Sequence, residues 1–337
     1  MNKNNMIFNY EEVCDDFLGD LPKRASDVIT RRFGLADGAE KETLQAIGDN
    51  MGITRERVRQ IENAALSKLK DKRKRHEPIF LFFNNQVKTT GNLRKEDILL
   101  KVLGGGKFEN QAFFLLYLGD EFSRFLEMRD FYTLWTIDKD SLKSAQKTLK
   151  KISEKLNKAS RPLPVEDLES ASRVNLPTLL AFLEVSKKIN KGPQGLWGFS
   201  DWPEISPRGV KDKAYIIFKN EERPLHFREV AELIDKADLF DSQKKTHPQT
   251  VHNELIKDGR FILVGRGIYA LSEWGYRPGT VKDVISAVLK ESKKPLTKEE
   301  IIEKVSKRRL VAENTILLNL HNKRYFKRNQ EGKYKLA

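Results

Sequence analysis

Residues 43–69 read TLQAIGDNMGITRERVRQIENAALSKL, and their pattern predicts two short amphipathic helices joined by a turn at 51–53. Thr54 is a favourable N-cap for the second helix, because its hydroxyl can accept a backbone N–H that has no partner within the helix. At about 100° per residue, the apolar face of this helix carries Val58, Ile61, Ala65 and Leu69. The opposite face carries Arg55, Glu56, Arg59, Gln60 and Asn63.

The polar face of the second helix has the chemistry of a recognition helix. Guanidinium, carboxylate and amide groups match the donors and acceptors that base pairs expose in the major groove, and the phosphates beside it. We therefore predict that the chain binds double-stranded DNA through this helix. The predicted contacts are Thr54, Arg55, Glu56, Arg57, Arg59, Gln60 and Asn63.

The segment from LPKRASDVITRRFGL (21–35) to Leu69, with its run TRERVRQIE, resembles region four of the primary sigma factors of bacterial RNA polymerase. The resemblance implies a helix-turn-helix that docks on the upstream promoter element. In that family, bases or phosphates are contacted at the positions that match Arg55, Glu56, Arg59 and Gln60. Arg57 is expected to meet the DNA backbone.

The same resemblance implies RNA polymerase core as a partner, held through the flap of its beta subunit. Four apolar residues either form part of that surface or belong to the core of the segment: Val28, Ile29, Phe33 and Leu35. No stretch resembles sigma region two, which opens the promoter. We therefore expect that the chain does not initiate transcription alone as a complete sigma factor.

Charge supports a polyanionic partner. The 337 residues carry a formal net charge of +14. Residues 55–75 contain nine Lys or Arg against three Asp or Glu, and the run KDKRKRH (70–76) directly follows the predicted recognition helix. A basic run can be a solvated linker, but this position favours phosphate contact. The predicted phosphate contacts are Lys72, Arg73, Lys74 and Arg75.

Composition also bounds the location of the protein. No apolar run approaches the roughly 20 residues that cross a bilayer, and the first residues have no apolar secretory core. Cys14 is the only cysteine, which excludes an internal disulfide framework and a multi-cysteine zinc site. We expect a cytoplasmic, nucleoid-associated bacterial protein without membrane contact.

After Pro78 a pattern of helix, helix, helix and two short β-segments recurs at an interval of roughly 60–70 residues, longer than common solenoid repeats. The clearest copies are 213–275 and 280–337, and fainter copies are 146–203 and 79–136. The endings IYALSEW, LWGFSDW and FYTLW align as one aromatic β-element. In the last copy, Thr297 and Glu300 predict a capping box, and 329–332 predicts a hairpin turn.

These patterns predict a mainly α fold: a sigma region-four-like helix-turn-helix followed by tandem winged-helix-like modules with small β-hairpin wings. The helix-turn-helix domain is expected at 1–75. Divergent winged-helix-like repeats are expected at 76–140 and 141–208, a helix-turn-helix module at 209–278, and a C-terminal winged-helix-like repeat at 279–337.

The copy at about 211–278 resembles the HARE helix-turn-helix, through RPLHFREVAELI and TVHNELIKDGRFILVGRGIYALSEWGY. That family includes a domain of the polymerase delta subunit and modules of restriction and chromatin proteins, so the resemblance implies DNA or polymerase binding. Arg266 lies in a Gly-Arg-Gly wing and is a predicted minor-groove contact, or alternatively an ordinary hairpin tip. We expect packing roles for Trp197, Trp202 and Trp274.

No catalytic residue set is apparent, so we expect no enzymatic activity, cofactor or metal site. LGGGK at 103–107 lacks the spacing of a phosphate loop and is expected to be a turn. His247 and His252 have no apparent partner ligand. Asp283, Glu291 and Lys293 would resemble a nuclease pattern only if the last two lay on a strand, and they end a helical stripe instead.

The sequence thus favours a sigma-like DNA-binding transcription factor that docks on promoter DNA and on RNA polymerase core. The first alternative is a DNA-targeting or interaction subunit of a restriction or defence system, which nuclease or methyltransferase genes nearby would favour. The second alternative is a cryptic nuclease, which plasmid cleavage with Mg²⁺ would reveal.

Overall fold

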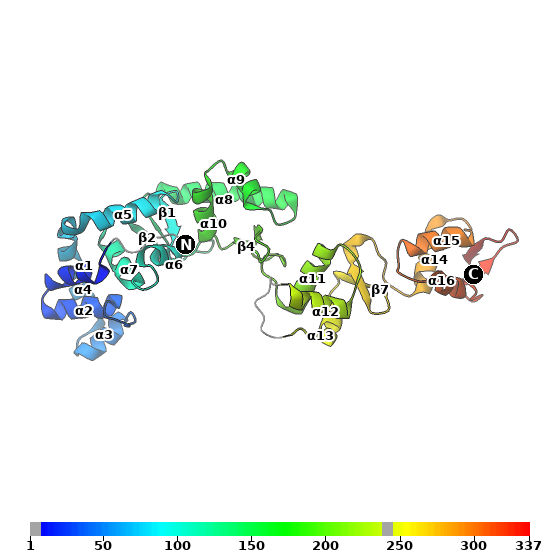
Figure 1. Ribbon diagram of the computed structural model, residues 1–337, viewed down its shortest axis with the longest axis horizontal. Helices are drawn as coiled ribbons and strands as arrows, with labels where there is room; N and C mark the ends of the chain where they lie inside the picture. Colours follow the sequence, from blue (N-terminus) through cyan, green and yellow to red (C-terminus); the bar gives the residue numbers. More distant parts are fainter. Residues whose placement is uncertain (1–7, 238–244) are drawn as a thin grey trace. The chain divides into compact units, whose positions relative to one another are not determined.

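The computed structural model describes residues 8–237 and 245–337. These residues form sixteen α-helices and short antiparallel strand pairs, which confirms the predicted mainly α fold (Figure 1). The chain divides into two compact units. The first runs to Asn190 and includes Leu196–Ser200, and the second comprises Lys191–Gly195 and Asp201–Ala337. No helix in the two described ranges combines the length and apolarity of a membrane span.

The first unit begins with four helices, and side-chain caps set the start of three of them. Asn9, Thr43 and Thr54 each accept the backbone N–H of the residue three positions later. The predicted Thr54 cap is thereby confirmed. The elements are α1 (Tyr10–Gly19), α2 (Lys23–Phe33), α3 (Leu44–Met51), α4 (Arg55–Asp71) and the short 3₁₀ helix η1 (Arg73–His76).

The turn between α3 and α4 depends on two glycines. Gly52 ends α3 with φ at +63°, a left-handed conformation that costs glycine little. A Cβ on Gly48 would lie 2.7 Å from the carbonyl oxygen of Ile53, so the chain closes tightly over α3 only with glycine there. A small core of Val28, Ile47 and Val58 then joins α2, α3 and α4.

Four modules with one element order follow. The first contains α5 (Glu77–Lys88), β1 (Leu93–Lys95), α6 (Glu96–Gly104), α7 (Glu109–Leu118), β2 (Ser123–Phe125) and β3 (Leu134–Thr136). The second contains α8 (Asp140–Ala159), α9 (Val165–Ser172), α10 (Leu176–Val185), β4 (Ile189–Lys191) and β5 (Trp197–Phe199). Both have three helices followed by a hairpin, as the faint repeats predicted.

The remaining two modules lie in the second unit. The third contains α11 (Gly209–Glu221), β6 (Leu225–His226), α12 (Phe227–Lys236), α13 (Pro248–Lys257), β7 (Phe261–Gly265), β8 (Ile268–Leu271) and the 3₁₀ helix η2 (Ser272–Trp274). The fourth contains α14 (Val281–Ser292), α15 (Lys298–Ser306), α16 (Glu313–Leu320), β9 (Phe326–Arg328) and β10 (Tyr334–Leu336). The Thr297–Glu300 capping box and the final hairpin are confirmed.

One buried leucine marks the same position in every module. It follows the first helix and pairs, antiparallel, with the last strand of the hairpin. The pairs are Leu93 with Thr136, Leu163 with Trp197, Leu225 with Tyr269, and Leu296 with Tyr334. The aligned aromatic endings therefore overlap the last strand of their hairpins. Each leucine pairs this strand with the segment that follows the first helix of its module.

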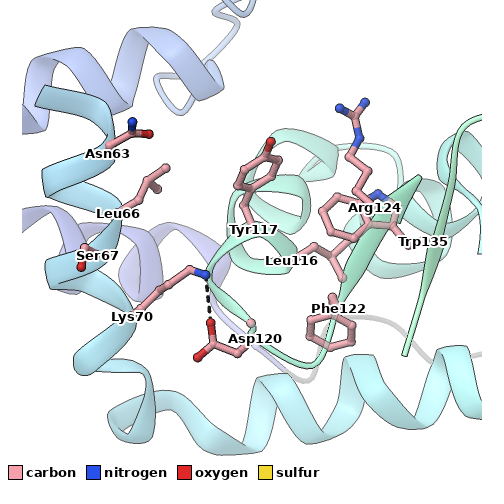
Figure 2. A pocket seen from close by; sticks show the side chains of 11 residues that line it. Asn63, Leu66, Ser67, Lys70, Leu116, Tyr117, Asp120, Phe122, Arg124 and Trp135 are labelled. Carbon is pink, nitrogen blue, oxygen red and sulfur yellow. Dashed lines mark hydrogen bonds and ion pairs between the residues drawn. The ribbon is translucent and has the colours of Figure 1, made fainter. Parts of the chain in front are cut away.

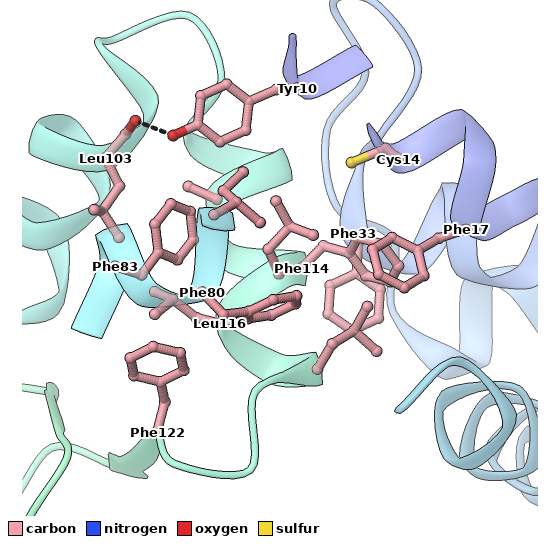
Figure 3. Close-up of a cluster of buried hydrophobic side chains, with 14 of the residues drawn as sticks. Tyr10, Cys14, Phe17, Phe33, Phe80, Phe83, Leu103, Phe114, Leu116 and Phe122 are labelled. Atoms are coloured by element: carbon pink, nitrogen blue, oxygen red, sulfur yellow. Dashed lines mark hydrogen bonds between the residues drawn. The ribbon is translucent and has the colours of Figure 1, made fainter. Parts of the chain in front are cut away.

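Helices α1, α2 and α4 share a core with the first module (Figure 3). Phe33 of α2 packs against Phe113, Phe114 and Tyr117 of α7, with ring centroids 5.2–5.9 Å apart. Tyr10 of α1 donates its hydroxyl to the carbonyl of Leu103 at 2.6 Å. Because this core crosses residue 75, the five-part domain division stays a proposal.

The core also accounts for the apolar residues considered as a polymerase surface. Val28, Ile29 and Phe33 are buried, and Leu35 is half-buried against the same cluster. The alternative that they are core residues is thus confirmed for the first three. Trp197 is buried as expected, and Trp274 is half-buried and contacts the ring of Phe218 edge-on.

Candidate nucleic-acid interface

Helix α4 presents one polar, exposed face. Val58, Ala65 and Leu69 are buried on its other side, and Ile61 is half-buried. Every predicted contact on the first three turns is exposed: Thr54, Arg55, Glu56, Arg57, Arg59, Gln60 and Asn63. The structure therefore brings the predicted residues together on a single helix surface.

Glu56 and Arg59 form a two-point ion pair at the centre of this face. The Arg59 Nε and Nη2 atoms donate to the two carboxylate oxygens of Glu56 at 2.9 and 2.7 Å. These hydrogen bonds hold the pKa of Glu56 below its ordinary value and raise that of Arg59. A guanidinium has five N–H donors, so Arg59 keeps three for another partner while Glu56 fixes its plane.

A second pair lies beside the first. The Arg57 Nη1 atom donates to the Gln60 Oε1 atom at 3.1 Å. Guanidinium edges pair with guanine and amide groups pair with adenine in the major groove. Two adjoining pairs on one exposed face thus supply complementary chemistry for base edges and phosphates.

The second half of α4 faces the first module across a groove of about 590 Å³ (Figure 2). Its α4 wall is made by Asn63, Leu66, Ser67 and Lys70, and its other wall by Leu116, Tyr117, Gly119, Asp120, Phe122, Arg124 and Trp135. The groove therefore begins at Asn63, the last of the predicted contacts on α4.

The groove adds residues that the sequence did not single out. Lys70 pairs with Asp120 at 2.9 Å, and Arg124 pairs with Glu96 at 2.7 Å. Tyr117 stays 41% exposed beside them. They flank the predicted interface because α7 packs on α2, a contact between distant residues that carries no local sequence signal.

Most of the basic run after α4 is neutralised within the chain. Lys72 and Arg75 pair with Asp20, the C-cap of α1, Arg75 reaches Asp16 at 3.8 Å, and Arg73 pairs with Glu121. The guanidinium of Arg73 also lies over the ring of Phe80. Lys74 is exposed and has no carboxylate partner among residues 8–237 and 245–337.

Arg266 lies at the tip of the third hairpin, between β7 and β8, and is exposed. Gly267 next to it has φ at +71°, and a Cβ there would meet the ring of His226 at 2.6 Å. The glycine therefore lets the wing pack closely and leaves Arg266 outside. Arg266 belongs to the second unit, whereas α4 belongs to the first.

Residues considered for chemistry have structural partners. Asp283 belongs to the capping box of α14, Glu291 pairs with Arg277 and Arg308, and Lys293 caps the helix, so none lies on a strand.

The two histidines considered as metal ligands also have structural partners. His252 contacts the hydroxyl of Tyr269, and His247 caps α13. Within the described parts of the chain, no group of three metal-ligating side chains occurs. Gly105 caps α6 with positive φ, so LGGGK is a helix end and turn.

Comparison with known families agrees with both resemblances. Residues 17–71 match the family described as Sigma-70, region 4. Residues 208–274 match the HARE-HTH family, whose description names ASXL and a restriction endonuclease HTH domain. The first match ends with α4, and the second contains the whole third module from α11 to η2.

Curated relatives match over the first region. RNA polymerase sigma factor sigB of Arabidopsis thaliana is 53% identical over 60 residues, which are 18% of this chain and 10% of the relative. RNA polymerase principal sigma factor HrdD of Streptomyces griseus is 48% identical over 59 residues, 18% of each chain. RNA polymerase sigma-C factor of a Nostoc species is 51% identical over 59 residues, 18% of this chain and 14% of the relative.

This chain therefore spans less than a fifth of the length of these relatives. Both family matches coincide with helix-turn-helix elements of the fold. The chain joins a Sigma-70 region 4 segment at 17–71 to a HARE-HTH segment at 208–274.

Proposed function

We propose that the protein is a DNA-binding transcription factor that reads promoter DNA with the exposed face of α4 and associates with RNA polymerase core. The observation that carries the proposal is the set of polar residues from Arg55 to Asn63, exposed on a helix whose segment matches Sigma-70, region 4. The proposed activity is docking, without a covalent step.

Charge and geometry support the DNA contact. A helix fits the major groove, which is about 12 Å wide, and recognition helices read bases with their N-terminal residues. The predicted contacts lie on the N-terminal part of α4, and Thr54 caps the helix there. In this proposal Arg59 and Gln60 contact base edges, and Arg55 and Glu56 contact bases or phosphates. Arg57 contacts the DNA backbone, and Lys74 contacts a phosphate beyond the helix.

The polymerase contact needs a surface other than the apolar residues of α2. Ile29 and Phe33 are enclosed by the core that α7 completes, and Val28 is buried in the small core with Ile47 and Val58, so all three side chains are inaccessible in the folded chain. A contact through the HARE-HTH segment is consistent with this burial. Co-purification of polymerase core with residues 1–200 or 201–337 separates the two locations, because this division follows the two compact units. If polymerase core co-purifies with neither unit and not with the full chain, the proposed association with polymerase is contradicted.

A second candidate function rests on the match at 208–274, whose family description names a restriction endonuclease. In that case the protein directs a restriction or defence enzyme to DNA. Nuclease or methyltransferase genes next to its own, and co-purification of their products in place of polymerase, would favour this candidate.

Genome-wide crosslinking of the tagged protein, with polymerase mapped in the same cells, tests the proposal. We expect peaks that coincide with promoters and with polymerase. Peaks that ignore promoters, or that follow sites of restriction-modification enzymes, would exclude the transcription role and favour the second candidate.

A further inference from the structure

We propose that the C-terminal hairpin, formed by β9 and β10, is a second DNA-binding site that holds the phosphate backbone of duplex DNA through Lys327, Lys333 and Lys335. This site lies outside both family matches and in a different compact unit from α4. It follows α16 at the red end of the chain in Figure 1.

The first observation is a pair of like charges in the strand register. Lys327 of β9 lies directly opposite Lys335 of β10. Side chains opposite each other in an antiparallel pair have Cβ atoms about 4.5–5.5 Å apart, and like charges at this distance destabilise the sheet. Both lysines are exposed, and neither has a carboxylate partner in the described ranges of the chain. The hairpin thus retains an electrostatic repulsion between Lys327 and Lys335 that is not required for folding.

The equivalent hairpins lack such a pair. In the third module, Phe261 faces Leu271 and Leu263 faces Tyr269. In the first module, Arg124 faces Trp135. The wing of this fold therefore forms with apolar or mixed pairs, and the opposed lysines are particular to the last hairpin.

The second observation is the charge around this pair. Residues 323–337 contain six Lys or Arg and one carboxylate, and the whole module at 279–337 contains fifteen against seven. The single carboxylate, Glu331, pairs with Lys333 at 3.0 Å. Arg328 is engaged within the hairpin, because its Nε atom donates to the carbonyl of Gly332 and its guanidinium lies over the ring of Tyr334.

Strand geometry puts three lysines on one side of the hairpin. Phe326 and Tyr334 are buried on the face toward the helices. Alternate residues of a strand share a face, so Lys327, Lys335 and Lys333, which directly precedes β10, project from the other face. Lys333 and Lys335 are about 6.6–6.8 Å apart along the strand. The outer face of the hairpin therefore carries a compact group of lysines, of which Lys327 and Lys335 have no carboxylate partner in the described residues.

This group of lysines fits duplex DNA better than a protein surface. Protein interfaces are depleted in lysine and need an apolar centre, whereas phosphate contacts use Lys and Arg and release counterions. A two-stranded ribbon fits the major groove of B-DNA, while the major groove of duplex RNA is too deep and narrow for side chains to read. Lysines that contact phosphate carry no base preference, so the hairpin adds sequence-independent affinity.

The test uses the full chain and a fluorescent duplex of arbitrary sequence, titrated at several salt concentrations. In the variant Lys327→Gln/Lys335→Gln, we expect the slope of log affinity against log salt to fall by about two units. The matched control is Lys298→Gln/Lys304→Gln, which removes two exposed lysines from α15 of the same module. We expect the slope of this control to stay close to that of the original protein.

A third variant separates binding from folding. Lys335→Glu places a carboxylate opposite Lys327, so we expect a melting temperature at or above that of the original protein together with weaker binding. A slope in the double variant equal to that of the control would overturn the proposal, as would tighter binding of single-stranded RNA than of the duplex. Arg59→Ala, measured in parallel on a preferred site, reports on α4 separately, so the two proposals can fail independently.

Discussion

The ring of Phe33, at the end of α2, packs edge-on against the ring of Phe114 in α7, with centroids 5.2 Å apart. Phe33 belongs to the sigma-like segment and Phe114 to the first winged module, so the two share one core. This contact places one wall of the Figure 2 groove beside the second half of α4. Packing between two modules therefore shapes the candidate interface.

Removal of the Phe114 ring should destabilise both parts of this core. Phe114 is fully buried, and Phe→Ala in a core costs about 3–5 kcal/mol. Hydrogen exchange in Phe114→Ala should show lost protection in α2 and α4 as well as in α7. Leu81→Ala, which changes a residue 57% exposed on α5, is the control and should alter little. Loss of protection confined to the first module would mean that the shared core is not cooperative.

The Thr54 cap should contribute stability and DNA affinity together. Its hydroxyl accepts the N–H of Arg57 at 3.2 Å, and loss of such a cap costs about 0.5–2 kcal/mol. Thr54→Ala should lower the denaturation midpoint and fray the turn that carries Arg55 and Glu56. Thr54→Ser keeps the hydroxyl and should behave like the original protein in both measurements. If the Thr54→Ala and Thr54→Ser variants bind DNA equally well, the stability of this helical turn does not limit recognition.

The third module should lose stability in acid through Asp258. Arg260 pairs with Asp258 at 2.6 Å and with Asp212 at 2.7 Å, and its hydrogen bonds hold the pKa of Asp258 below its ordinary value of 3.8. A carboxyl whose pKa is lower in the folded state stabilises the fold above its unfolded pKa. That contribution disappears as the pH falls through the lowered folded value.

Urea denaturation of the full chain from about pH 2 to 5 measures this effect. Asp258→Asn should reduce the dependence of stability on pH in this range. Asp71→Asn, which changes a residue of α4, is the control and should leave the pH dependence of the stability of the third module unchanged. An unchanged pH dependence in Asp258→Asn would show that the pair with Arg260 adds no acid-sensitive stability.

The basic run should divide into two kinds of residue. Lys74 has no carboxylate partner in the described residues, so Lys74→Ala should lower the salt slope of DNA binding by about one unit on all sequences alike. Arg73 is engaged with Glu121 and Phe80, so Arg73→Ala should reduce stability more than the slope. Equal slope losses for both would indicate that the ion pairs of the run open when DNA binds.

Local patterns sufficed for much of the fold. The spacing of Val58, Ala65 and Leu69 predicted the buried side of α4, and the hydroxyl of Thr54 predicted where the helix begins. The capping box at Thr297 and the last hairpin followed in the same way. Each rests on residues that are close in sequence, where helix geometry and hydrogen-bond chemistry leave few alternatives.

Long-range partners were not predictable. Arg73 pairs with Glu121, and Phe33 contacts Phe114, only when the N-terminal helices pack against the first module. The periodicity of the sequence does not predict this packing. The register that sets Lys327 against Lys335 depends on the length of the turn between the strands. For the same reason the sequence suggested free phosphate contacts at Lys72, Arg73 and Arg75, where the structure has ion pairs.

The most direct test of DNA reading by α4 is a selection from random duplex DNA with the full chain and with Arg59→Ala. We predict a preferred site for the original protein. We also predict that Arg59→Ala loses about 1–3 kcal/mol on that site and relaxes the preference at one position. The control Lys298→Gln, on α15, should select the same site as the original protein. If Arg59→Ala selects the same site with unchanged affinity, the exposed face of α4 does not read DNA.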